Sequence, residues 1–320
     1  MTATGAPSSG LRPAVLLFAG LAIGCTAPER DSDPPPPETP TGSAPVESSV
    51  GRVYERQIAF LELEPEDDAL AVGWWFRTET NRDSPRREAW GWLGRGDNWD
   101  AFFRDAWITS PDEAPWRLHP RDPMRLEIGA GDDLENVVYR SEGRYLELRI
   151  GTPVVSWREA RGGTIRLSEA LVTLQDKETP GLVFDLQRAR GLESEDGPDW
   201  TEWFLLVGDD LRVALVADEP STWQAWILDD AGDRPLPLLA SQWTGRRVLD
   251  DARREVPTGW VLTGTRGEVE VTLEVDGSYL EPLEGPGPVF GVDGLQVVSG
   301  VWVMGADTIE VHGLQRLSQR

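Results

Sequence analysis

The sequence predicts an all-β protein, built from antiparallel sheets that close into barrels or sandwiches, with few short helices. Apolar and polar residues alternate strictly over 269–275 and in shorter form over 146–150 and 165–167, which is the period of a half-buried strand. Gly, Asp and Asn clusters separate such segments, and those residues tolerate the positive φ of tight hairpins. Helical periodicity is scarce, and short connections favour antiparallel pairing over crossovers.

The elements follow in chain order. Further strand-like runs lie at 57–63, 70–78, 99–108, 182–187, 203–207, 211–216, 223–228, 259–264, 295–304 and 308–317. Turn-like clusters lie between them at 94–98, 131–133, 208–210, 230–232 and 276–277. The best helix candidates, around 111–116 and 246–254, are short. No fixed-period repeat is visible, which argues against a propeller.

The first 24 residues are predicted to be a signal peptide. An apolar run, 13–24, ends at Cys25, the one cysteine of the chain. As a helix it would span roughly 18 Å, too short for a hydrocarbon core of about 30 Å. The run Ala22-Ile23-Gly24-Cys25 resembles the lipobox of bacterial lipoproteins, which implies that Cys25 is acylated and becomes the mature N-terminus. An ordinary secretory peptide is the alternative.

Residues 25–50 are predicted to be a disordered tether rich in Pro and Ser, because they contain no aromatic residue that could build a core. Two acyl chains at Cys25 would make membrane attachment stable. Thr26, rather than Asp, follows Cys25. By resemblance to the rule that sorts bacterial lipoproteins by this residue, the protein is expected in the outer membrane if the host has two membranes.

The remaining body is long for one barrel. The acidic segment 191–198 is the best divider. We therefore expect an N-terminal β domain at 51–195 and a C-terminal β domain at 196–320.

Charge and composition exclude several classes of protein. The formal net charge is −24, which argues against nucleic acid as a partner. One cysteine and two histidines exclude disulfide frameworks, multi-thiolate zinc sites and three-histidine metal sites. The sequence lacks a nucleophile elbow, a phosphate loop and a dinucleotide fingerprint. We predict no cofactor and no metal site.

Tryptophans and C-terminal glycines carry a family resemblance. The segment Gly73-Trp-Trp-Phe-Arg-Thr78 resembles the opening strand of the lipocalin-like family that includes carotenoid 1,2-hydratases and AttH-type proteins. Trp243, the segment 257–260 and the strand 269–275 look like later motifs of that family, and 300–313 is similar to its closing strands. The resemblance implies two consecutive lipocalin-like barrels.

Two departures from the family pattern concern carboxylates. Gly73 stands where the family has a Glu, and Val298-Ser299-Gly300 stands where it has Trp-Glu-Gly. Glu310 is the acidic position of that pattern that survives. Hydration of an alkene needs a positioned acid, so these departures weigh against hydratase chemistry.

Tryptophans are the candidate ligand-binding residues. Trp74 and Trp75 are adjacent on a strand and must point to opposite faces. Trp90 and Trp92 share a face, and with Trp260 they are candidates for the wall of an apolar cavity. We expect such a cavity to be ringed by Trp74, Trp90 and Trp92. Packing of these indoles in the core is the alternative, and it is favoured.

Glu310 and His312 are the candidate catalytic pair. They lie two residues apart on a predicted strand, on the face opposite Ile309 and Val311. A carboxylate beside the imidazole would orient it for acid–base work; an exposed, solvated pair explains the same spacing and is favoured. His119 is assigned to the surface.

Two further patterns are interpreted as turns. The Asp doublets at 132–133, 209–210, 229–230 and 250–251 lack the order of a calcium loop. The tripeptide 95–97 has the sequence Arg-Gly-Asp, which we attribute to a hairpin.

These observations favour an extracytoplasmic, lipid-anchored protein of the cell envelope that binds a hydrophobic small molecule. Its partners would be that molecule and, through the anchor, the membrane. An enzyme acting on an isoprenoid-like apolar substrate, of hydratase or isomerase type, is one alternative. A carbohydrate-binding or structural envelope lipoprotein is another.

Overall fold

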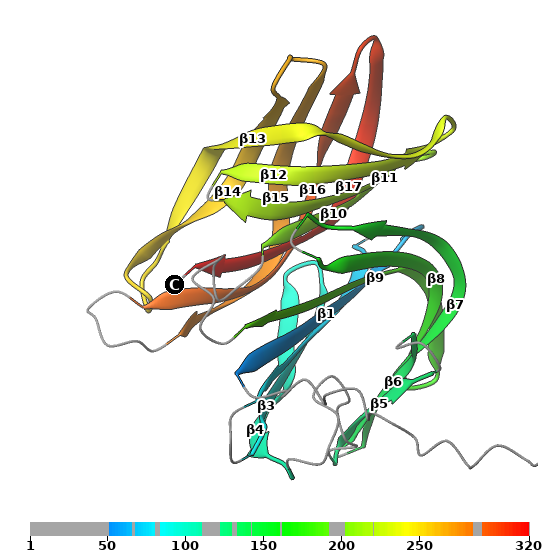
Figure 1. Ribbon diagram of the computed structural model, residues 1–320, viewed down its shortest axis with the longest axis vertical. Helices are drawn as coiled ribbons and strands as arrows, with labels where there is room; N and C mark the ends of the chain where they lie inside the picture. Colours follow the sequence, from blue (N-terminus) through cyan, green and yellow to red (C-terminus); the bar gives the residue numbers. More distant parts are fainter. Residues whose placement is uncertain are drawn as a thin grey trace, which may run out of the picture. The chain divides into compact units, whose positions relative to one another are not determined.

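A computed structural model describes residues 51–65, 68–80, 84–110, 122–129, 133–141, 143–160, 162–191, 202–219, 221–283 and 290–319. These residues form 17 strands in two antiparallel sheets, and no helix occurs among them. The all-β fold class is therefore confirmed (Figure 1).

The first sheet contains nine strands in the order β4-β3-β2-β1-β9-β8-β7-β6-β5. Its strands are β1 (Arg52–Glu62), β2 (Leu70–Glu79), β3 (Arg86–Arg95), β4 (Asn98–Ile108), β5 (Met124–Ile128), β6 (Leu134–Ser141), β7 (Arg144–Arg158), β8 (Thr164–Leu174) and β9 (Lys177–Gly191). The sheet curls strongly, and among the described strands β4 and β5 are its two edges.

The second sheet is a closed barrel of eight strands, because β10 pairs with both β11 and β17. Its strands are β10 (Trp203–Val207), β11 (Arg212–Glu219), β12 (Thr222–Asp229), β13 (Gly232–Leu249), β14 (Arg254–Gly264), β15 (Val269–Leu283), β16 (Gly291–Met304) and β17 (Asp307–Gln319). A closed barrel beside a curled sheet is consistent with two lipocalin-like units, although only the second closes within the described residues.

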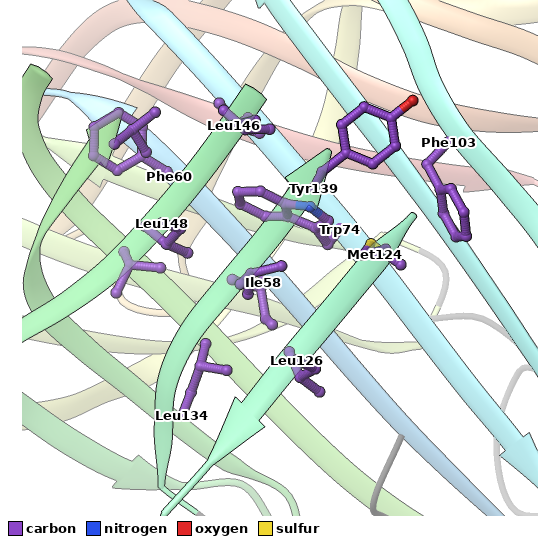
Figure 2. Close-up of a cluster of buried hydrophobic side chains, with 14 of the residues drawn as sticks. Ile58, Phe60, Trp74, Phe103, Met124, Leu126, Leu134, Tyr139, Leu146 and Leu148 are labelled. Carbon is purple, nitrogen blue, oxygen red and sulfur yellow. The ribbon is translucent and has the colours of Figure 1, made fainter. Parts of the chain in front are cut away.

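Alternation along the strands builds three apolar layers. The first lies inside the curled sheet, where Trp74 and residues of β4 and β6 meet, and Figure 2 shows this cluster. The second fills the barrel with residues that include Phe204, Trp260 and Trp302. The third joins the outer faces of the two sheets, for example Phe184 against Trp203, whose ring centroids are 4.6 Å apart.

Two local predictions are wrong. No helix forms at 246–254, where β13 runs to Leu249 and a turn leads into β14 at Arg254. Ala252 anchors that turn, since its side chain is fully buried and its N–H donates to the Leu249 carbonyl at 3.1 Å. The segment 276–277 is not a hairpin turn but a β-bulge inside β15, where the register shifts between Val275 and Gly277.

Other sequence predictions concern residues outside the described part of the chain. These are the signal peptide, Cys25, the tether and the possible helix at 111–116. Residues 47–320 form one compact unit, in which the described strands of the first sheet end at Gly191 and those of the barrel begin at Trp203. The domain boundary near 195 stays a prediction. Among the described residues, no helix is long and apolar enough to cross a membrane.

Candidate functional site

Strand register places one row of side chains across five strands of the barrel. Ser299 pairs with both Glu274 and His312, and His312 also pairs with Val207, which pairs with Arg212. Directly paired residues in antiparallel strands point to the same face, with Cβ atoms about 5 Å apart. The row lies on the outer face of the barrel, because its neighbours Val207 and Val297 pack against the first sheet. Residues far apart in sequence thus meet at one site.

A pocket of about 600 Å³ lies over this row, bounded on one side by the end of β1. Its volume is in the range of small-molecule sites. Apolar walls alternate with charged and polar groups. The lining residues are Leu63, Glu64, Val207, Gly208, Asp209, Arg212, Ser299, Gly300, Val301, Glu310, Val311 and His312.

His312 is held as a neutral imidazole. The Nε2 atom of the ring is buried and has no hydrogen-bond partner among the described residues. Burial lowers the pKa of His312 below 6.5, and the positive charge of Arg212 lowers it further, against smaller opposing effects of the Glu62 carbonyl and Asp276. A neutral histidine with an unpaired Nε2 is a candidate general base.

Asp276 is a carboxyl group that sequence reasoning missed. The bulge in β15 brings it beside Ser299, whose Oγ donates to Asp276 Oδ1 at 2.9 Å. Desolvation raises the pKa of Asp276 most, and the negative charges of Glu274 and Asp68 raise it further. Ser299 stands where the family pattern has a Glu, so an acidic group is restored here from the neighbouring strand. No sequence signal marked it, since Asp276-Gly277 is also a good hairpin turn.

Arg212 supplies positive charge at the other end of the row. Its Nη1 donates to the carbonyls of Gly208 at 2.5 Å and Leu211 at 2.8 Å, which fixes the β10–β11 turn. Burial lowers the pKa of Arg212, against the opposing charges of Asp210 and Asp209. Its described contacts include no ion pair, so its charge acts on the pocket and on His312.

Glu310 reaches the same pocket as His312 but does not touch it. The two side chains lie on one face of β17, opposite Val311, as the sequence predicted. No hydrogen bond or ion pair joins them. Glu310 is solvent-exposed, whereas His312 is half-buried. Their catalytic roles stay predictions.

The five candidate tryptophans lie in apolar clusters, outside this pocket. Trp74 packs inside the first sheet and Trp260 inside the barrel. Trp75, Trp90 and Trp92 form a separate apolar cluster, distinct from the three layers described above, against Tyr279 and Leu283 of β15. Within it, the ring centroids of Trp75 and Trp90 are 5.2 Å apart and those of Trp90 and Trp92 are 5.9 Å apart.

One cavity ringed by Trp74, Trp90 and Trp92 is ruled out. Trp75 pairs with Trp90, so these two indoles share a face that Trp74 cannot reach. Core packing therefore accounts for these indoles in the structure, and a role for them in ligand binding stays a prediction.

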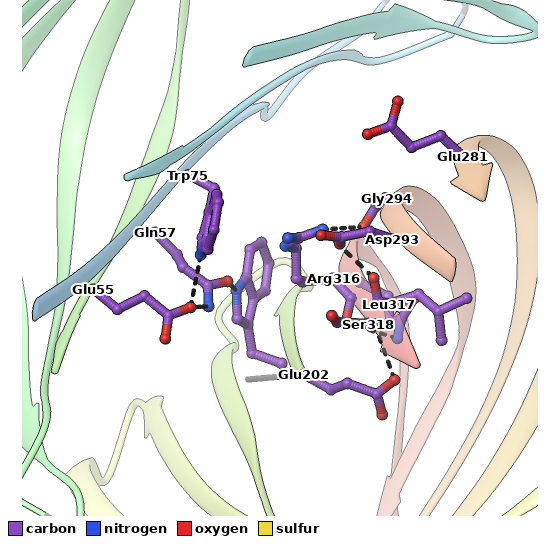
Figure 3. A network of polar contacts seen from close by, with 12 residues as sticks. Glu55, Gln57, Trp75, Glu202, Glu281, Asp293, Gly294, Arg316, Leu317 and Ser318 are labelled. Carbon is purple, nitrogen blue, oxygen red and sulfur yellow. Dashed lines mark hydrogen bonds and ion pairs between the residues drawn. The ribbon is translucent and has the colours of Figure 1, made fainter. Parts of the chain in front are cut away.

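Polar groups border the indole cluster. Trp75 Nε1 donates to Glu55 at 2.8 Å, and the guanidinium of Arg316 lies 4.7 Å from the ring centroid of Trp92. Figure 3 shows Arg316 paired with Asp293 beside Ser318. At Gly73, where the family has a Glu, an added Cβ would lie 3.0 Å from Leu295 Cδ2, so a side chain there would require Leu295 to shift.

Cys25 and His119 lie outside the described residues. In the described part of the chain, no group of three or more His, Cys, Asp or Glu residues could hold a metal ion. Asp209, Asp229 and Asp250 lie in bends or at turns.

Two other pockets, of about 270 and 380 Å³, lie in the first sheet. Arg56 lines one and Asp185 lines the other, and these two side chains already form a buried ion pair at 2.7 Å. The pocket at His312 is therefore the better candidate for acid–base chemistry.

Comparison with known proteins supports the fold. No protein-family model and no curated protein sequence matches the chain. Among solved structures, kievitone hydratase from Nectria haematococca matches with a TM-score of 0.53 and 13% identity, over 85% of this chain and 90% of its own. A protein named as a candidate AttH from Nitrosomonas europaea matches with a TM-score of 0.56 and 12% identity, over 87% and 98%.

CghA, crystallised with Sch210972, matches with a TM-score of 0.50 and 14% identity, over 84% of this chain and 89% of its own. At such identities the similarity concerns the fold. The chain therefore has the fold of AttH-type and hydratase proteins, and the resemblance drawn from the tryptophan and glycine motifs is confirmed at that level.

Proposed function

We propose that this chain binds a small, largely apolar molecule in the pocket between β1 and the barrel, and acts on it by acid–base chemistry of hydratase or isomerase type. One observation carries the proposal. His312 lines a pocket of about 600 Å³, has a lowered pKa, and carries a buried Nε2 that has no hydrogen-bond partner among the described residues. Perturbed titratable groups in clefts are enriched at functional sites.

The pocket and its border supply both kinds of group that addition of water needs, because His312 and Glu310 line the pocket and Asp276 is hydrogen-bonded to the lining residue Ser299. His312 Nε2 accepts a proton from water, whose oxygen bonds to one alkene carbon. A carboxylic acid, Asp276 or Glu310, donates a proton to the other carbon, and the π bond breaks. The substrate gains H and OH, and transfer of the proton from His312 to the carboxylate restores the site. In the reverse direction the same groups eliminate water.

The reaction class rests on two supports. A raised pKa keeps Asp276 protonated at higher pH than an ordinary Asp. In addition, kievitone hydratase, which shares the fold, is a hydratase by name. Leu63, Val207 and Val301 offer apolar wall to part of a substrate, and charged and polar groups line the rest of the pocket.

The test measures binding and turnover separately. The purified full chain is incubated with a panel of isoprenoid alkenes in water enriched in oxygen-18, and products are followed by mass spectrometry. Loss of a general base costs a factor of about 10²–10⁴ in rate, so His312→Gln should lower turnover by that factor.

The chain's other histidine provides the matched control. His119→Gln should leave turnover unchanged. Undiminished turnover in His312→Gln would refute the assigned base. If a probe binds, as measured by tryptophan fluorescence, but no turnover is detected, the chain would be a carrier of apolar molecules and not an enzyme.

The tether is part of the proposal and rests on sequence alone. Acylation of Cys25 would hold the pocket at the surface of a membrane of the cell envelope, close to apolar molecules dissolved there. Metabolic labelling with an alkyne fatty acid should mark the native chain and not Cys25→Ser. Fractionation of the envelope would then locate the membrane.

A further inference from the structure

Arg212 is the positive charge in the wall of the pocket at His312. Among the described residues that line this pocket, it is the one arginine or lysine. Val207 of β10 pairs with Arg212 on β11 and with His312 on β17. The three side chains therefore point to the same face, and the Cβ atoms of Arg212 and His312 are two strand steps, or about 10 Å, apart. A small molecule that contacts His312 can thus reach Arg212 as well.

One nitrogen of the Arg212 guanidinium is anchored to the backbone. Its Nη1 donates to the carbonyls of Gly208 at 2.5 Å, Leu211 at 2.8 Å and Asp209 at 3.3 Å. Nε and Nη2 donate to no described residue, and no carboxylate in the described part of the chain forms an ion pair with Arg212. Neither of these two atoms is buried. The turn thus fixes the guanidinium through Nη1, and the edge formed by Nε and Nη2 keeps its donors unused.

The same edge of two other arginines binds a carboxylate in this protein. Arg56 donates from Nε and Nη2 to the two carboxylate oxygens of Asp185, at 2.9 and 2.7 Å. Arg188 donates in the same way to Glu159, at 2.7 and 2.8 Å. Two parallel N–H groups match the two oxygens of a carboxylate, and such charge-assisted pairs are stronger than neutral hydrogen bonds. The unused edge of Arg212 therefore has the geometry of a carboxylate site.

Burial makes an anionic ligand favourable at Arg212. The residue is half-buried, and desolvation lowers its pKa, against the opposing charges of Asp210 and Asp209. An anion on the Nε–Nη2 edge would offset that desolvation. The carboxylates of Glu64, Asp209 and Glu310 also line the pocket. These residues are exposed, so salt screens their repulsion of an anion more strongly than it screens the direct contact.

We propose that Arg212 binds the carboxylate of the substrate, and that the pocket takes an unsaturated carboxylic acid with an apolar chain. The carboxylate lies on the Nε–Nη2 edge, and the double bond lies at His312. The chain lies along the apolar wall formed by Leu63, Val207 and Val301. This inference rests on the proposed function only for the step at the double bond.

The test compares a carboxylic acid with its neutral amide. Farnesoic acid has an isoprenoid chain with several double bonds, and its primary amide has the same shape without the charge. Binding of each compound to the full chain is measured at pH 8 by isothermal titration calorimetry. A hydrogen bond to a charged group contributes about 1.5–3 kcal/mol, and about 1.4 kcal/mol is tenfold in affinity. The acid should therefore bind at least about tenfold more tightly than the amide.

Substitution of Arg212 separates carboxylate binding from a purely structural role in the β10–β11 turn, which needs Nη1 alone. Arg212→Gln should weaken binding of the acid at least about tenfold and leave binding of the amide unchanged. Arg212→Lys keeps a donor for the turn but lacks the paired edge, so it should lower the preference for the acid even if Arg212→Gln fails to fold. Arg234 is the matched control, because this barrel arginine already pairs with Asp229 outside the pocket. Arg234→Gln should change neither affinity.

The outcomes distinguish this inference from the proposed function. Equal affinities for acid and amide in the unchanged chain, or equal losses for both in the Arg212 variants, overturn the carboxylate site. Tight binding of the acid through Arg212 without turnover counts against the proposed function alone. Turnover of neutral alkenes as fast as that of the acids counts against the role of Arg212 alone. If neither compound binds, both proposals fail.

Discussion

His312 acquires its chemistry from neighbours that are remote in sequence. Arg212 lies two strands away in the barrel, and a bulge in β15 brings Asp276 beside Ser299, the residue paired with His312. Burial and the nearby cation both disfavour the imidazolium. A base built in this way is neutral, and therefore active, above its lowered pKa.

The pH dependence of turnover follows from the lowered pKa of His312. Because the pKa of His312 lies below 6.5, kcat/KM should be constant around neutrality and fall only as the pH drops below 6.5. Removing the cation in Arg212→Gln should raise the pKa and move the acidic limb to higher pH. Arg234→Gln, which breaks an ion pair with Asp229 elsewhere on the barrel, should not. A pH–rate profile of each variant decides, and an acidic limb above 6.5 in the unchanged chain would contradict the assignment.

Glu202 is a second titrating group, at the start of β10. Its Oε1 accepts the N–H of Ser318 at 3.1 Å (Figure 3). Desolvation raises the pKa of Glu202 from 4.5 to about 7, despite that hydrogen bond and the charge of Arg316. The folded state thus binds a proton that the unfolded state releases at lower pH.

Stability should therefore decrease as the pH rises from 4.5 to 7, by about 3 kcal/mol at most. Glu202→Gln keeps the acceptor and removes the charge, so it should match the unchanged chain near pH 4.5 and exceed its unfolding free energy at pH 8. Urea denaturation at both values measures the difference. Glu255→Gln, at an exposed ion pair with Arg246, is the control that should show no such trend. Equal differences at both pH values would exclude Glu202 as the source.

At this scale the sequence predicted part of the site. The 2-residue period of a strand correctly placed Glu310 and His312 on one face, opposite Val311. Asp276 and Arg212 were missed because their proximity depends on strand register and on a bulge, which no single-strand pattern encodes.

At the scale of elements, close backbone contacts account for two glycines of the closing segment 300–313, one on β16 and one on β17. An added Cβ at Gly300 would collide with the carbonyl oxygen of Thr272 on β15, and one at Gly313 with that of Leu205 on β10. Glycine in a strand interior often marks such close backbone approaches. In this chain, glycine at these two positions is therefore required by the close approach of neighbouring barrel strands.

Gly300→Ala should lower the unfolding free energy by about 3 kcal/mol or more, because the clash is with backbone that cannot rotate away. Gly305 lies in the hairpin after Gly300, with φ of 64° and nothing within 4 Å of an added Cβ. Gly305→Asn should cost less than about 1 kcal/mol, since Asn tolerates positive φ. Thermal denaturation of both variants provides the comparison, and equal costs would refute the close-approach argument.

Strands were easier to predict than the connections between them. All the predicted strand runs lie within observed strands, apart from one or two residues at their ends. The helix expected at 246–254 failed because the pairing of Leu249 with Arg254 closes a hairpin there, with Arg253 at a φ of 54°. The pattern of polar residues over 246–254 resembles that of a short helix. Only the burial of Ala252 distinguishes the observed hairpin turn from a helix.

At the scale of the whole compact unit, residues 47–320, the apolar layer between the two sheets determines whether either sheet can fold without the other. Leu61, Phe184 and Leu186 of the first sheet pack against Trp203 and Leu314 of the barrel. Trp203 Nε1 also donates across this layer to Gln57 at 2.5 Å. Among the described residues, each sheet thus has an apolar outer face that the other sheet covers. The composition of the chain did not predict how the tryptophans divide between these faces and the interiors of the sheets.

The predicted halves, 51–195 and 196–320, should therefore not behave as independent domains. Expressed separately, each would expose a contiguous apolar face, which promotes aggregation or a loosely packed state. Co-expressed, they should form a soluble complex with near-ultraviolet circular dichroism like that of the full chain, and the full chain should unfold in one transition. Gel filtration and calorimetry measure these outcomes. If each half is a soluble monomer with its own cooperative transition, the layer around Trp203 is a contact between finished domains, and the pocket at His312 would then be free to open by movement of one domain against the other.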